Sequence, residues 1–136
     1  MTLQNSFKME LLSKSNNESF VRVAVAAFAA QLDPTIEEIN DIKTAVSEAV
    51  TNCIVHGYKN TLGKIYITVE LLEQRMLRIN IRDRGCGIAN VQQAMEPLFT
   101  TGGEERSGLG FSVMQSFMDK VGVRSVPGRG TTVTLQ

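Results

Sequence analysis

The sequence predicts an α/β (α+β) two-layer sandwich, in which one mixed and mainly antiparallel sheet carries helices on one face. Three observations support this prediction. Segments with an alternation of apolar and polar residues outnumber the strands that a doubly wound parallel sheet would need. The helical patterns cluster between these segments. The length of 136 residues fits a single domain, which we place over residues 1–136.

A strand followed by a helix is expected at the start of the chain. Residues 6–12, "SFKMELL", predict the strand. The helix begins near "SNNE", where Ser15 can cap it and Glu18 stands three residues later, as in a capping box. It stops at "LDPT", where Asp33 can cap a second helix with Pro34 in its first turn.

The second helix is expected from about 34 to 56, because apolar residues recur there at helical spacing. Gly57 is a natural stop. Two alternating stretches then predict a hairpin joined by "EQ": residues 63–72, "GKIYITVELL", and residues 75–83, "RMLRINIRD".

The last part of the chain is expected to form a loop, a helix and two strands. The loop covers 90–108 and the third main helix runs from about Gly108 to Lys120. The closing strands are "VGVRSV" and "TTVTLQ", on either side of the turn "PGRG".

Composition excludes several classes of protein. Lys plus Arg equals Asp plus Glu at 14 each, so no electrostatic footprint for nucleic acid or an anionic membrane is expected. Cys53 and Cys86 form neither a disulfide framework nor a metal site, because no further ligand stands at metal-binding spacing. The start lacks a secretory apolar region, and no apolar run approaches the ~20 residues of a membrane span. We therefore expect a reduced, cytoplasmic protein.

Three short motifs can carry chemistry. In "SEAVTN", Glu48 and Asn52 are four residues apart on one helix face, opposite the apolar stripe. A carboxylate can act as a base, and an amide oxygen is a hard ligand for Mg²⁺. The alternative is an ordinary solvated polar face.

The second motif is "DRGCG", in which Asp83 can accept a hydrogen bond from an exocyclic amine. Gly85 and Gly87 permit positive φ and a close approach of a ring to the backbone. A plain glycine turn is the alternative for this motif.

The third motif is "ERSGLGF", where Gly108 and Gly110 open a helix whose free N–H groups suit an anion. Arg106 could add a phosphate contact. The alternative is an ordinary glycine-rich helix entry.

The order of the three motifs resembles the ATP-binding (Bergerat-type) fold shared by DNA gyrase, the Hsp90 chaperones, histidine kinases and MutL. "SEAVTN" is similar to its N box, "DRGCG" to its first glycine box and "SGLGF" to its second. The run from "SFVRVAVAAFAAQLDPT" to "IKTAVSEAVTNCIVHGY", with "PLFTT" and "ERSGLGF", resembles the sporulation anti-sigma-F factors over nearly the whole chain.

That resemblance implies a homodimeric serine kinase that binds ATP or ADP with Mg²⁺. It implies that the protein inhibits a sporulation sigma factor and phosphorylates a serine of an anti-anti-sigma partner, without contacting nucleic acid or membrane. It also implies roles for single residues. Glu48 is the general base, Asn52 the Mg²⁺ ligand and Asp83 the reader of the adenine amine. The pocket and lid are shaped by Gly85, Gly87, Gly108 and Gly110.

Two further roles follow from the resemblance. Thr131 matches a threonine near the adenine, although a β-forming residue of a last strand would read the same way. Arg22 matches an arginine that contacts protein partners, although it could be a solvated side chain. The lid departs from the family at Gly102 and Gly103, where close relatives carry a lysine-proline pair and one more residue, so a lysine that could contact phosphate is missing here.

Rival interpretations stay open at this point. A histidine kinase would need a separate phosphoacceptor helix, and His56 is better read as a residue at the pocket edge or in the structure. A nucleotide-dependent anti-sigma protein without kinase activity is one alternative, which Glu48 disfavours. The related stress-response anti-sigma kinase is another.

Overall fold

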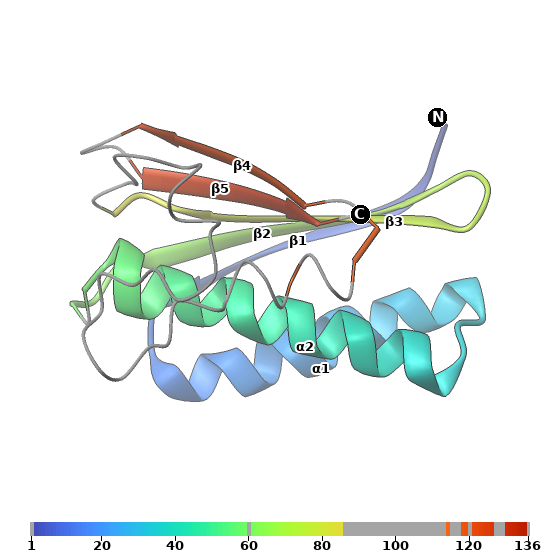
Figure 1. Ribbon diagram of the computed structural model, residues 1–136, viewed down its shortest axis with the longest axis horizontal. Helices are drawn as coiled ribbons and strands as arrows, with labels where there is room; N and C mark the ends of the chain where they lie inside the picture. The colour runs from blue at the N-terminus through green and yellow to red at the C-terminus, as the bar shows by residue number, and fades with distance from the viewer. Residues whose placement is uncertain are drawn as a thin grey trace.

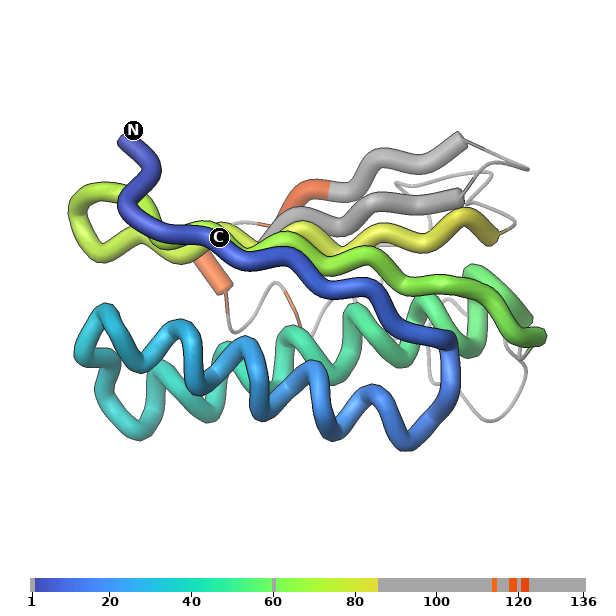
Figure 2. The backbone as a smooth tube through the Cα atoms, turned by 180° about the vertical axis from the view of Figure 1, so that it is seen from behind, coloured from blue at the N-terminus to red at the C-terminus, as the bar shows by residue number. Residues whose placement is uncertain are grey.

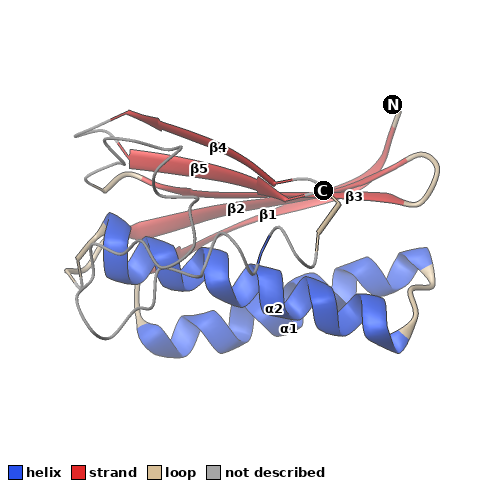
Figure 3. Cartoon of the chain, in the orientation of Figure 1, coloured by secondary structure: helices blue, strands red, loops and turns tan. Residues whose placement is uncertain are grey.

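The computed structural model describes residues 2–59, 61–85, 114, 118–119, 121–126 and 130–135. These residues form two layers, a five-stranded sheet and a pair of helices, α1 (Ser15–Ala29) and α2 (Ile36–Asn52). Both helices lie on the same side of the sheet (Figures 1 and 3). The predicted two-layer sandwich with helices on one face is therefore confirmed.

The sheet contains β1 (Leu3–Leu12), β2 (Lys64–Leu72), β3 (Met76–Asp83), β4 (Val121–Val126) and β5 (Gly130–Leu135), in the order β1-β2-β3-β5-β4. Seen from behind, β1 runs along one edge of the sheet (Figure 2). Every pairing between these described strands is antiparallel, where we expected a mixed sheet. Two helices separate β1 from β2, so the chain crosses the sheet face twice and re-enters in the opposite direction. A single helical crossover would have made a parallel pair.

The predicted hairpin is confirmed, and its alternation sets which side chains face the helices. In β3, Leu77, Ile79 and Ile81 are buried while the residues between them are not. Successive side chains of a strand point to opposite faces. Asp83 falls on the same row as these apolar residues and is buried with them. The Asp83 carboxylate therefore lies on the side of the sheet that faces the helices.

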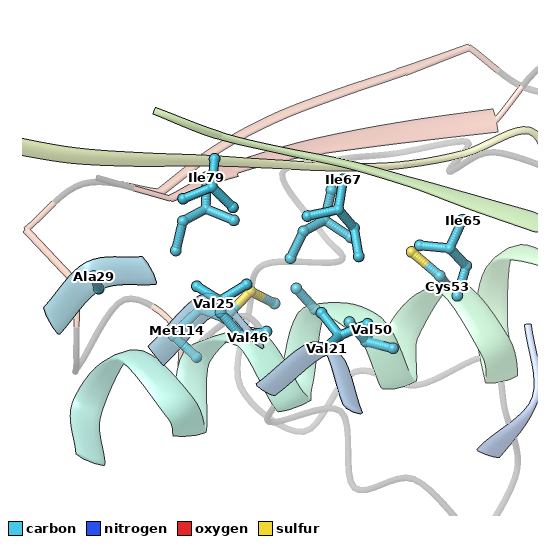
Figure 4. Packing of buried hydrophobic residues seen from close by; sticks show 14 of the residues in the cluster. Val21, Val25, Ala29, Val46, Val50, Cys53, Ile65, Ile67, Ile79 and Met114 are labelled. Atoms are coloured by element: carbon cyan, nitrogen blue, oxygen red, sulfur yellow. The ribbon is translucent and has the colours of Figure 1, made fainter. Parts of the chain in front are cut away.

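The core fills the space between the layers. Helix α2 contributes Ala45, Val46, Ala49 and Val50, and helix α1 contributes Val21, Val25, Ala26 and Ala29. Figure 4 shows several of these side chains between the helices and the isoleucines of the sheet. Met114, which is helical, is also fully buried in this cluster. Burial of such aliphatic side chains is the main driving force for the packing.

Both predicted helix caps were wrong. The N-cap of α1 is Lys14, and no side chain caps the helix, so Ser15 is its first helical residue. The N-cap of α2 is Thr35 and not Asp33. Asp33 ends a 3₁₀ turn, Ala30–Leu32, in the left-handed conformation at φ 52°. An N-cap residue needs an extended backbone, which Thr35 has and Asp33 lacks.

Thr35 and Glu38 form the reciprocal capping box that we had expected at α1. The Thr35 Oγ1 accepts the Glu38 N–H at 3.1 Å, and the Thr35 N–H donates to Glu38 Oε1 at 2.8 Å. These bonds satisfy two backbone groups around the start of α2.

The second helix ends differently from a regular α-helix. From Cys53 to Gly57 the chain continues as a π-helix, η2, and the Tyr58 N–H donates to the Cys53 carbonyl at 2.9 Å. Gly57 ends the helical segment, as predicted. No helix in the described part of the chain is long and apolar enough to span a membrane.

Most of the predicted third helix, 108–120, lies outside the described residues, and so do the loop at 90–108 and part of the last turn. The strands predicted after it are present as β4 and β5.

Candidate nucleotide-binding site

The structure describes six of the ten predicted site residues. These are Arg22, Glu48, Asn52, Asp83, Gly85 and, by its place in β5, Thr131. The other four, Gly87, Arg106, Gly108 and Gly110, lie outside the described residues, as do Gly102 and Gly103.

Glu48 and Asn52 lie one turn apart on the last part of α2. Both are partly exposed, whereas Val46, Val50 and Cys53 are buried. The predicted division of this helix into a core face and an accessible polar face is therefore present. Asn52 is the last α-helical residue before η2, which places its amide where the backbone geometry changes.

Asp83 ends β3 and is 4% exposed. Its Oδ1 accepts the N–H of Gly85 at 2.9 Å, which closes a turn directly after the strand. Burial of a carboxylate is unfavourable unless hydrogen bonds compensate for the lost water. The carboxylate of Asp83 is thus held in a defined place by its own following turn.

Gly57 packs against this carboxylate from the end of η2. A Cβ on Gly57 would lie 2.7 Å from Asp83 Oδ2, which is too close for a real side chain. A Cβ on Gly85 would overlap the Gly57 carbonyl oxygen. The end of η2 and the turn after β3 therefore lie in close contact, and position 85, where the clash is with backbone, requires glycine. The sequence pattern indicated a helix stop at Gly57 but not its contact with Asp83.

Tyr58, which follows η2, links the residue after β3 to the start of β2. Its Oη accepts the Arg84 N–H at 2.8 Å and donates to the Lys64 carbonyl. Partial burial raises the pKa of Tyr58 above its ordinary value of 10.0, so the phenol stays protonated. The Arg84 guanidinium lies 4.8 Å from the centre of the Tyr66 ring. Tyr58 was not singled out from the sequence, because its role depends on contacts distant along the chain.

Sheet register places Thr131 beside Asp83. The two residues are Cα partners between β5 and β3, and Ile65 is the partner of Asp83 on β2. The predicted adenine-side residues Asp83, Gly85 and Thr131 thus meet at one end of the sheet, next to η2.

Arg22 lies apart from these residues, on α1. Its guanidinium is 3.6 Å from the Glu18 carboxylate and donates to the Ser19 hydroxyl at 3.2 Å. It is partly exposed, as a residue that contacts a protein partner needs to be.

The described residues fit a nucleotide with a magnesium ion. Asp83 supplies a buried acceptor for an amine, and the partly exposed Asn52 supplies an amide oxygen. No group of three acidic, histidine or cysteine side chains that could hold a metal occurs among the described residues. A magnesium ion here would therefore depend on phosphate and water oxygens for most of its ligands, as it commonly does.

Comparison with known proteins defines the class first. A family model for the histidine kinase-like ATPase domain matches residues 13–136. The catalytic domain of the histidine kinase ThkA covers 96% of this chain and 93% of its own, with a TM-score of 0.59 and 19% identity. The RsbU and RsbW domains of a Mycobacterium tuberculosis protein give a TM-score of 0.68 at 21% identity, covering 97% of this chain and 31% of that one. The fold is that of an ATP-using domain of the kinase type.

Curated relatives give the particular family. An anti-sigma F factor of Caldanaerobacter subterraneus is 58% identical over 99% of this chain and 94% of its own. The anti-sigma F factors of Clostridium acetobutylicum and Geobacillus thermodenitrificans are 53% and 51% identical, each over 98% of this chain and 94% and 92% of their own. The chain belongs to the anti-sigma F factors of the histidine kinase-like ATPase family.

Proposed function

We propose that this anti-sigma factor binds and inhibits a sporulation sigma factor, and that it uses Mg-ATP to phosphorylate a serine of an anti-anti-sigma protein. The observation that carries this proposal is the contact of the buried Asp83 carboxylate with the end of η2 at Gly57. There a buried acceptor meets the end of the helix that bears Glu48 and Asn52. The relatives of the chain, which are named anti-sigma F factors, support the proposal as well.

Each described residue has a separate task in the proposed reaction. Asp83 accepts a hydrogen bond from the adenine amine, since an ionised carboxylate can only accept. Asn52 holds the magnesium ion, which neutralises charge on the phosphates when bound. Glu48 takes the proton from the serine hydroxyl, so that the oxygen bonds to the terminal phosphorus of ATP while the bond to the bridging oxygen breaks and ADP leaves. Its partly exposed position on α2 suits a base that must meet a group on another protein.

Four residues of the proposed site lie outside the described part of the chain. The proposal assigns Gly87 to the adenine, and Gly108, Gly110 and Arg106 to the phosphates. Thr131 joins the adenine end through its register with Asp83. Arg22 contacts the protein partners, and two copies of the chain form a homodimer.

Incubation with labelled ATP, Mg²⁺ and an anti-anti-sigma protein tests the proposal. Label should appear on a serine of that protein, and should stay absent when the magnesium is chelated or when the serine is replaced by alanine. The sigma factor should bind the same preparation in a pull-down. Sigma binding with no label transfer would leave a nucleotide-dependent binding protein in place of a kinase.

The adenine assignment has its own test, in the replacement of Asp83 by asparagine. The amide can present a donor to the adenine amine, so ATP affinity should fall at least about tenfold, the usual scale for a hydrogen bond to a charged group. Titration calorimetry measures this. Equal binding of ATP and GTP by the unaltered protein would contradict the assignment.

A further inference from the structure

The pairing of β2 with β3 ends at a phenol that stands between the two strands. The register pairs Ile65 with Asp83. One further step of the same register would place Lys64 opposite Arg84. The hydroxyl of Tyr58 bridges these two residues, because its oxygen accepts the Arg84 N–H at 2.8 Å and it donates to the Lys64 carbonyl. One side chain thus satisfies both backbone groups, and β3 ends at Asp83.

The ring and the backbone of Tyr58 are held as well as its hydroxyl. A Cβ on Gly63 would lie 2.4 Å from Cε1 of the ring, so the ring packs directly on the backbone before β2. The Tyr58 N–H donates to the Cys53 carbonyl at 2.9 Å, and the Tyr58 carbonyl accepts the Thr61 N–H at 2.8 Å. Because all three parts of the residue are held, the phenol can set the position of the groups that bind it.

The place of Arg84 matters because this residue lies between the Asp83 carboxylate and the N–H group that binds it. The Gly85 N–H donates to Asp83 Oδ1 at 2.9 Å. Two successive N–H groups, those of residues 84 and 85, therefore bind the phenol and the carboxylate. Gly57, the residue before Tyr58, lies against the same carboxylate. The Tyr58 hydroxyl thus fixes the backbone on which the bond between Gly85 and Asp83 depends.

We propose that Tyr58 is a positioning residue for base recognition, whose hydroxyl ends the pairing of β2 with β3 and so holds the Asp83 carboxylate in place for the adenine amine. This inference rests on the proposed function, in which Asp83 reads adenine. Without the hydroxyl, the Arg84 N–H and the Lys64 carbonyl would need new partners, in each other or in water. The turn after Asp83 would then lose its fixed place. A ring without the hydroxyl would fill the same space and leave the turn unattached.

The test compares binding of ATP with that of ITP, which carries an oxygen in place of the adenine amine. Titration calorimetry on the full chain with Mg²⁺ gives both affinities for the unaltered protein and for Tyr58→Phe, which loses the hydroxyl and keeps the ring. The preference for ATP over ITP should fall about fivefold, as for the loss of one ordinary hydrogen bond to the amine. Equal losses of affinity for both nucleotides would overturn the inference, because they would show a structural role alone.

Tyr66→Phe is the matched control, because it removes the same atom beside the same arginine. The Tyr66 ring lies 4.8 Å from the guanidinium of Arg84, and phenylalanine keeps that ring. The bond from the Arg84 N–H to Tyr58 is left intact. The ATP-to-ITP preference of this variant should therefore equal that of the unaltered protein. The same loss of preference in Tyr66→Phe and Tyr58→Phe would overturn the inference, since removal of either phenol hydroxyl would then have one effect.

The two levels of the proposal fail in distinguishable ways. If the unaltered protein does not prefer ATP to ITP, Asp83 does not read adenine and both ideas fall. If it does prefer ATP and Tyr58→Phe matches it, only the role of Tyr58 falls.

Hydrogen exchange of the Arg84 amide tests the same idea on the unaltered protein, should Tyr58→Phe not fold. Coupling between two binding events is reciprocal. If the bond from the Arg84 N–H to Tyr58 favours recognition of the amine, binding of the amine must in turn favour that bond. Saturation with ATP should therefore slow exchange of this amide more than saturation with ITP does. Equal exchange rates in the two complexes would refute the role of Tyr58.

Discussion

The carbonyl oxygen of Gly57 faces the Cα of Gly85 so closely that no side chain fits at residue 85. This contact joins the end of η2 to the turn after β3, on the side of the sheet where Asp83 is buried.

Replacing Gly85 by alanine should separate the helix end from the strand end. Because the clash is with backbone, stability should fall by about 1–3 kcal/mol, the range for overpacked sites, and nucleotide affinity should fall with it. In Gly57→Ala the new Cβ meets the Asp83 carboxylate, which can rotate away. That variant should lose nucleotide affinity with a smaller loss of stability. Urea unfolding and titration calorimetry measure the two effects, and equal stability losses in both variants would contradict the distinction.

Replacing Glu48 by glutamine should remove the proposed base and keep the shape of the side chain. Transfer of phosphate to the anti-anti-sigma protein should fall by about a hundredfold or more, the usual contribution of a general base. Sigma binding should be retained. Glu37→Gln, in the exposed first turn of the same helix, is the control and should transfer phosphate normally. Normal transfer by Glu48→Gln would remove Glu48 as the base.

Replacing Asn52 by alanine should weaken the binding of Mg-ATP and make it insensitive to magnesium. Loss of a hard oxygen ligand should lower affinity at least about tenfold. Calorimetric titrations with and without Mg²⁺ would show this as a loss of the magnesium-dependent part. Asn40→Ala, at an exposed position of α2, should behave like the unaltered protein. A full magnesium response in Asn52→Ala would rule out the metal role.

Replacing Thr35 by alanine should destabilise the protein by about 1 kcal/mol, because Oγ1, the acceptor of the Glu38 N–H at the start of α2, is lost. The Thr35 N–H, which the substitution keeps, lowers the pKa of Glu38, so the separate contribution of that hydrogen bond is present at neutral pH and is lost as the pH falls through that pKa. Ser15→Ala should change stability by less than about 0.5 kcal/mol, since no side chain caps α1. Urea unfolding of the two variants decides the matter, and a larger loss in Ser15→Ala would reverse the assignment of the caps.

The buried thiol predicts how stability changes in alkali. The pKa of Cys53 is raised in the folded state, so its contribution is complete below the pKa of the unfolded thiol and is lost as the pH rises above it. From about pH 9 upward, the free energy of unfolding should fall by up to about 1.4 kcal/mol per pH unit. Cys53→Ala should show a shallower fall over the same range in urea unfolding. Parallel pH profiles would mean that the thiol is not protected by folding.

Local periodicity predicted most of the fold. The alternation in residues 75–83 predicted the strand, and the same two-residue period explains the burial of its last residue, which was not predicted. The helical spacing around Val46 and Val50 similarly predicted which face of α2 packs on the sheet. These signals depend on neighbours along the chain, which is why they could be read directly.

Features that depend on backbone angles or on contacts distant along the chain could not be predicted from local periodicity. Asp33 and Thr35 are both good capping residues, and only the left-handed conformation of Asp33 decides between them. The role of Tyr58 arises from the Arg84 N–H, 26 positions further along the chain. The π-helix that brings Cys53 and Gly57 to Asp83 has no residue pattern that predicts it.

The register between β3 and β5 has a consequence for the kinetics of folding. Asp83 and Thr131 are neighbours in the sheet although 48 positions separate them in the chain. The β2–β3 hairpin needs only a short turn, whereas the pairing of β5 with β3 must first close a long loop, at a cost in entropy. The proposed adenine site, at Asp83 and Thr131, should therefore be completed late. Pulse-labelling hydrogen exchange should protect the β2–β3 amides before those that join β3 to β5, so binding competence would appear only after most of the sheet has formed.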